Sequence, residues 1–127
     1  MLVICVGLIR SASTLQYQLC RELLNKTDHT LIDYWYTEKI QEIEHAINKR
    51  NNVPLSIIKT HSYFDIFGSI SDCDDIAFLT SYRDLRESSM SAMEAYKMPF
   101  DEVVSSKWFE TEMKTLSQLK KLDKILF

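Results

Sequence analysis

Continuous apolar runs alternate along the chain with segments in which apolar residues recur every three or four positions. The runs Leu2–Leu8, Val53–Thr60 and Ile76–Tyr82 are typical of strands that are buried on both faces of a parallel sheet. Leu31–Tyr36 predicts a shorter strand, and Lys124–Phe127 predicts a last one.

Helical periodicity lies between these runs. Ile40, Ile43 and Ile47 share one face of a predicted helix from about Thr37 to Arg50. A helix with Leu15, Leu19, Leu23 and Leu24 at helical spacing is expected to end near Asn25. Two more are expected over Asp84–Met98 and, after a break at Pro99, over Asp101–Leu122. Tyr63–Asp75 is expected to be loop, with room for a helical turn.

Alternating strands and helices imply βαβ units, which build a parallel sheet covered by helices. The expected fold is therefore a three-layer α/β fold with a parallel sheet of four to five strands flanked by helices. Its first strand-to-helix unit is expected to be P-loop-like. With 127 residues, the chain is expected to form a single domain over residues 1–127.

Composition narrows the function classes. The net charge of −3 excludes a nucleic-acid reader that relies on a strongly basic surface. The chain has three cysteines, Cys5, Cys20 and Cys73, and no two of them have a CxxC spacing. Because their number is odd and this spacing is missing, neither a disulfide framework nor a metal site is expected. The apolar run Leu2–Ile9 is too short to span a bilayer and lacks the flanks of a signal peptide. We therefore expect a cytoplasmic protein without a membrane partner.

The segment between the first strand and the first helix has the setting of a phosphate-binding loop. Free N–H groups of a first helical turn and the helix dipole both favour an anion there. Arg10 adds a positive charge, and Ser13 and Thr14 add hydroxyl donors. The alternative is that residues 11–14 only cap the helix. Against the nucleotide-triphosphatase pattern G-x-x-x-x-G-K-[ST], Ala12 stands at the second glycine and Ser13 at the lysine, which disfavours hydrolysis of ATP or GTP.

Two more polar clusters follow the next two apolar strands. Lys59 and His61 lie two residues apart in an extended segment and share one face. Arg83 ends the third strand, and Ser91 follows eight residues later. Because the carboxyl ends of parallel strands meet at one edge, all three clusters are expected to converge there. The alternative for Arg83 is a surface ion pair with Asp84 or Glu87.

Taken together, the three clusters resemble those of the sulfotransferases that use 3′-phosphoadenosine 5′-phosphosulfate. Arg10-Ser11-Ala12-Ser13-Thr14 is similar to the family's 5′-phosphosulfate motif, for which many members read P-R-S-G-S-T-W. Lys59-Thr60-His61 matches its K-T-H motif. Arg83 and Ser91 match the arginine and serine of its 3′-phosphate motif. Residues 100–127 are similar to the helix and strand that follow in the family.

The resemblance implies transfer of a sulfuryl group to a hydroxyl or amine of a small-molecule or saccharide acceptor, without a metal. It implies catalytic roles for His61 as general base and for Lys59 and Arg10 as charge stabilisers. The donor-binding residues that it implies are Arg10, Ser11, Ala12, Ser13, Thr14, Arg83 and Ser91.

The sequence departs from the family at several positions. Ile9 replaces the usual proline, Ala12 the usual glycine, and Leu15 the aromatic residue that packs on adenine. The family continues beyond the equivalent of Phe127 with a Gly- and Lys-rich loop that closes over the 3′-phosphate. A non-catalytic nucleotide-binding or phosphoanion-binding remnant of this fold, and a P-loop kinase or NTPase, therefore stay open as alternatives. A homodimer in which a second subunit completes the site also stays open.

Overall fold

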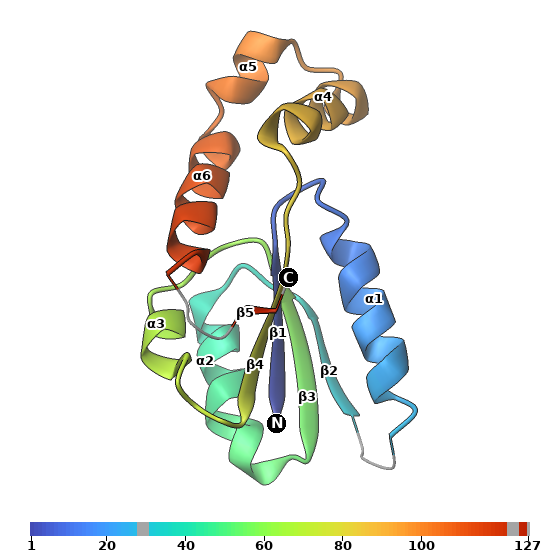
Figure 1. Ribbon diagram of the computed structural model, residues 1–127, viewed down its shortest axis with the longest axis vertical. Helices are drawn as coiled ribbons and strands as arrows, with labels where there is room; N and C mark the ends of the chain where they lie inside the picture. The colour runs from blue at the N-terminus through green and yellow to red at the C-terminus, as the bar shows by residue number, and fades with distance from the viewer. Residues whose placement is uncertain (28–30, 122–124, 127) are drawn as a thin grey trace.

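The apolar runs form the parallel strands of one sheet in the structure, a computed structural model that describes residues 1–27, 31–121 and 125–126. The strand order is β2-β3-β1-β4-β5, and each pair of neighbours is parallel (Figure 1). The strands are β1 (Leu2–Gly7), β2 (Leu31–Tyr36), β3 (Leu55–Thr60), β4 (Ile76–Ser81) and β5 (Ile125–Leu126). The α/β class with a parallel sheet flanked by helices is confirmed.

The central strand β1 shows why its sequence is apolar at every position. All six of its residues are buried, because helices cover both faces of the sheet. Leu2, Ile4 and Val6 join the larger core cluster, whereas Val3 and Cys5 join a smaller cluster on the opposite face. Alternation of side chains along a strand thus supplies both cores from one continuous run.

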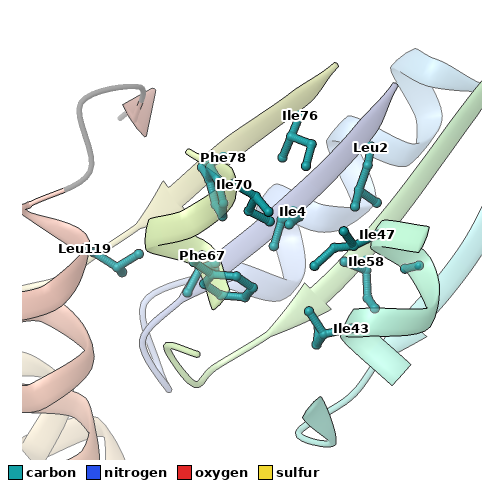
Figure 2. Close-up of a cluster of buried hydrophobic side chains, with 12 residues drawn as sticks. Leu2, Ile4, Ile43, Ile47, Ile58, Phe67, Ile70, Ile76, Phe78 and Leu119 are labelled. Carbon is teal, nitrogen blue, oxygen red and sulfur yellow. The ribbon is translucent and has the colours of Figure 1, made fainter. Parts of the chain in front are cut away.

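Helices cover the two faces unequally. The larger core packs under α2 (Ile40–Lys49) and α3 (Ile66–Ile70), with Phe67 and Phe78 in edge-to-face contact at its centre (Figure 2). On the other face lies α1 (Ser13–Leu24). Beyond the carboxyl ends of the central strands lie α4 (Leu85–Tyr96) and α5 (Phe100–Val104), and α6 (Lys107–Leu119) returns towards the sheet (Figure 1).

The first helix is rotated relative to its leucine pattern. Leu15, Leu19 and Leu23 are exposed, and the buried face of α1 begins at Ser13 and continues through Tyr17. Ser13 docks against Gly7, where a Cβ on the glycine would overlap Ser13 Cβ. This close approach fixes the rotation of the helix, so packing at its first turn overrides its apolar stripe.

The prediction of a single helix over Asp101–Leu122 is wrong. Two helices, α5 and α6, meet at Ser105 and Ser106, and Ser106 is extended. Ser105 Oγ donates to Asp101 O at 2.6 Å, and Ser106 Oγ donates to Val103 O. Serine hydroxyls that bond nearby carbonyls offer the backbone an alternative to helix continuation.

Smaller differences concern boundaries. The second helix begins at Ile40 rather than Thr37, because Thr37 still bonds through its N–H to Lys59 O at 3.0 Å. Tyr63–Asp75 is mainly irregular, as expected, and its helical turn is α3. In the last predicted strand, Lys124 and Phe127 lie outside the described residues. None of the helices in the described ranges is long and apolar enough to cross a membrane.

Candidate functional site

The three polar clusters meet at the carboxyl edge of the sheet. The register pairs Gly7 of β1 with Ser81 of β4, and Val6 with Thr60 of β3, so the three strands end side by side. A cavity of about 450 Å³ opens at this edge. It is lined by Ile9, Arg10, Ala12, Ser13, Thr14, His61, Arg83, Ser91 and Tyr96.

The loop from β1 to α1 depends on an unusual backbone. Arg10 and Ala12 both have φ 64°, a left-handed conformation that costs a non-glycine residue roughly 1–2 kcal/mol. Ser11 lies between them and ties the loop to β4, because its Oγ donates to Leu8 O at 2.6 Å and contacts Ser81 O at 3.0 Å. The Ser11 side chain therefore supports the loop and does not line the cavity.

The first turn of α1 borders the cavity with backbone donors that have no acceptor within the helix. Its N-cap is Ala12, and no side chain caps the helix. The alternative that residues 11–14 only cap the helix is therefore wrong. The N–H groups of Ser13 and Thr14 fall in the first turn, where a helix offers no internal acceptor. Together with the helix dipole, they form a setting for an anion.

Lys59 lies behind this loop rather than in the cavity wall. Its side chain points from β3 and is buried, with 4% of the residue exposed. The ammonium Nζ donates to Thr14 Oγ1 at 2.9 Å and lies 5.3 Å from the centre of the Tyr36 ring. Burial lowers the pKa of Lys59. The lysine thus places a positive charge directly under the first turn of α1.

The imidazole of His61 bridges the loop and β3. Its Nδ1 bonds to Gly7 O, and a carbonyl only accepts, so Nδ1 carries the proton. Nε2 therefore holds the lone pair, and it lies 3.5 Å from Lys59 Nζ. Burial, followed by the nearby Lys59 charge, lowers the pKa of His61, against the raising effect of the Gly7 carbonyl. The ring is accordingly neutral at pH 7.

The arginines make different contacts at the rim. Arg10 Nε donates to Ser91 Oγ at 3.0 Å, which links the loop to α4. Arg83 Nε forms an ion pair with Glu87 Oε2 at 2.9 Å, as the alternative interpretation of the sequence expected, and Arg83 also lines the cavity. Both side chains of the pair are well exposed, and such pairs are worth only about 0–1 kcal/mol. Arg83 is thus available to a stronger anion.

Sequence reasoning missed several residues near this cavity. Tyr96, at the end of α4, lines it. A second cavity of about 230 Å³ shares Ile9 and His61 with the first, and is also lined by Tyr36, Glu38, Ser62, Thr111 and Glu112. Glu112 follows Phe109 by three residues and precedes Leu116 by four, so a charged residue within the apolar stripe of this helix was the available signal.

Comparisons with known proteins leave the site to be interpreted from its own chemistry. No protein-family model, no curated protein and no solved structure matches the chain. Within the described ranges, no group of three or more His, Cys, Asp or Glu side chains is placed to hold a metal ion.

Proposed function

We propose that the chain is a sulfotransferase that uses 3′-phosphoadenosine 5′-phosphosulfate as its donor. The observation that carries this proposal is the shared cavity. Residues of all three sequence motifs line it, although they come from separate parts of the chain. We also interpret the β1-loop-α1 unit as P-loop-like, because a close-approach glycine precedes an uncapped helix N-terminus with a buried lysine beneath it.

The donor would bind with its phosphosulfate at the first turn of α1. The N–H groups of Ser13 and Thr14 belong to that turn, and Arg10 lines the same cavity, so these residues would hold the phosphosulfate. Arg83 would exchange its exposed ion pair with Glu87 for the 3′-phosphate, since charge-assisted contacts of this kind contribute about 1.5–3 kcal/mol. Tyr96 offers the aromatic surface for the base that Leu15 cannot offer.

The transfer step needs a base for the acceptor and charge stabilisation for the departing phosphate. The acceptor oxygen attacks sulfur, the bond between sulfur and the 5′-phosphate oxygen breaks, and adenosine 3′,5′-bisphosphate leaves. His61 Nε2 would take the acceptor proton, because this nitrogen holds the lone pair and the ring is neutral at pH 7. Lys59 and Arg10 would stabilise the charge that develops on the leaving phosphate.

Calorimetric titration with adenosine 3′,5′-bisphosphate tests the binding part of this proposal. We expect this ligand to bind more tightly than AMP, and ATP with Mg²⁺ to bind no better than AMP. Tighter binding of ATP with Mg²⁺ would instead favour the P-loop kinase or NTPase alternative. Transfer of labelled sulfate from the donor to a panel of phenols, alcohols and sugars then separates an enzyme from a non-catalytic remnant.

Arg83→Ala gives the binding test its specificity. The variant should weaken adenosine 3′,5′-bisphosphate by about tenfold or more and leave AMP nearly unchanged, because only the bisphosphate carries the 3′-phosphate. Arg86→Ala is the matched control: Arg86 carries the same charge three residues further along the chain, in the first turn of α4, but bonds to Asp84 instead of lining the cavity. Equal losses for both ligands in Arg83→Ala would remove Arg83 from the 3′-phosphate site.

A further inference from the structure

The second cavity lies against the first, with the His61 ring and Ile9 in both walls. The two cavities differ in charge. Arg10 and Arg83 line the larger one, which suits an anionic donor. Glu38 and Glu112 line the smaller one, and neither an arginine nor a lysine belongs to its lining among the described residues. A molecule in the smaller cavity would therefore meet two carboxyl groups on its way to His61.

Glu112 is the residue that points to a ligand. It lies on α6 and is only 2% exposed. Its Oε1 accepts the backbone N–H of Ile9 at 2.6 Å, whereas its Oε2 is buried and has no hydrogen-bond partner. A buried carboxylate oxygen without a donor is costly, so such groups in native proteins call for an explanation. An N–H donor on a bound molecule would supply the missing bond.

Glu38, in the segment between β2 and α2, adds a second carboxylate to this cavity. Its Oε1 accepts the backbone N–H of His61 at 2.7 Å, so the carboxylate is held beside the imidazole. Tyr36, which is partly exposed, provides an aromatic wall, and its ring lies 5.3 Å from the His61 ring. The cavity thus combines an aromatic surface, two carboxylates and the proposed base.

We propose that the second cavity is the acceptor subsite and that it selects an alcohol or phenol that carries a protonated amine. This inference rests on the proposed function, which places the sulfuryl donor in the first cavity. The ammonium group binds between Glu112 and Glu38, and the hydroxyl faces His61 Nε2. On transfer, the hydroxyl oxygen bonds to sulfur, the bond between sulfur and the 5′-phosphate oxygen breaks, and adenosine 3′,5′-bisphosphate leaves. The hydroxyl proton moves to His61, and the ammonium group stays charged.

The carboxyl of Glu112 is tuned in a way that fits this assignment. Burial, and to a smaller extent the Glu38 charge, raises its pKa to about 7 against the lowering effect of the Ile9 N–H. A bound ammonium group would favour the ionised form of Glu112, because a nearby positive charge offsets the cost of removing the carboxylate from water. The volume of about 230 Å³ suits a small acceptor group better than a long chain.

A set of phenols of similar size tests the charge preference: tyramine, 4-ethylphenol and 4-hydroxyphenylacetate. Their affinities are measured by calorimetry on the full chain saturated with adenosine 3′,5′-bisphosphate, so that binding is read without turnover. We expect tyramine to bind at least about tenfold more tightly than 4-ethylphenol, and 4-hydroxyphenylacetate to bind more weakly than both. Transfer rates from the sulfuryl donor should follow the same order.

The variants Glu112→Gln and Glu38→Gln test whether these two carboxylates cause the preference for tyramine. Each should reduce the advantage of tyramine over 4-ethylphenol by about tenfold. The second variant keeps the test decisive if the first fails to fold. Glu110→Gln is the matched control, because Glu110 is an exposed residue of the same helix and does not line the cavity, so the advantage should persist there.

The outcomes separate this inference from the proposed function. If adenosine 3′,5′-bisphosphate does not bind, the proposed function fails, and the acceptor subsite fails with it. If the bisphosphate binds but tyramine and 4-ethylphenol bind equally, only the acceptor assignment is overturned. A preference for tyramine that persists in both carboxylate variants would also overturn it.

Discussion

The strongest consequence of the buried Glu112 carboxyl is a pH dependence of stability in the ligand-free protein. Its pKa is about 7 in the folded state, against an ordinary value of 4.5. The folded protein therefore holds this proton more tightly than the unfolded chain. The resulting contribution to stability is complete below pH 4.5 and is lost as the pH rises through about 7.

The magnitude follows from the interval between the two values. From 4.5 to about 7, at roughly 1.4 kcal/mol for each pH unit, the loss amounts to about 3–4 kcal/mol. Three titratable residues line the same cavity as Glu112, namely Tyr36, Glu38 and His61. Burial raises the pKa of Tyr36 to about 12, so its phenol does not titrate in this range. The pKa of His61 is lowered on folding, so its contribution is present above about 6.5 and lost as the pH falls. Glu112 and His61 therefore change the free energy of unfolding in opposite directions as the pH rises.

Glu112→Gln isolates the glutamate, because the amide keeps an acceptor for the Ile9 N–H but does not titrate. The free energy of unfolding would be measured in urea from pH 4.5 to pH 8 for both proteins. We expect the variant to gain about 3–4 kcal/mol relative to wild type over this range. Glu110→Gln should show no such trend. A difference between Glu112→Gln and wild type that does not change with pH would refute the reasoning.

Two further predictions concern the loop and the base. Gly7→Ala should destabilise the protein by about 1–3 kcal/mol in urea unfolding, since the new Cβ would overlap Ser13 Cβ and lie 2.5 Å from Ser81 Oγ. Gly68→Ala, whose Cβ would meet only the tip of Tyr63 at 3.3 Å, is the control, and equal effects would contradict the close approach. His61→Ala should lower sulfuryl transfer by about 10²–10⁴-fold while adenosine 3′,5′-bisphosphate binds as before. In wild type, the transfer rate should fall on the acid side only below pH 6.5, because the pKa of His61 is lowered. Undiminished transfer by His61→Ala would show that His61 is not the base.

Much of the fold was predictable because local patterns and the final packing agree. β1 is apolar throughout since both of its faces are covered, and the stripe of Ile43 and Ile47 on α2 faces the core as its spacing predicts. Where they disagree, tertiary contacts prevail. The leucines of α1 predicted a helix, but the contact between Gly7 and Ser13 determines which of its faces is buried.

In the candidate site, too, some features follow from the sequence and others only from the tertiary structure. By itself, the sequence determined the strands, their order along the chain and the polar clusters that follow them, because strand ends in a parallel sheet share one edge. Only the tertiary structure decided that Ser11 supports the loop and that Lys59 lies beneath it. It also brought Glu112 to Ile9 across more than a hundred residues. Contacts between distant elements depend on how helices pack over the sheet edge, and no local pattern of residues encodes that packing.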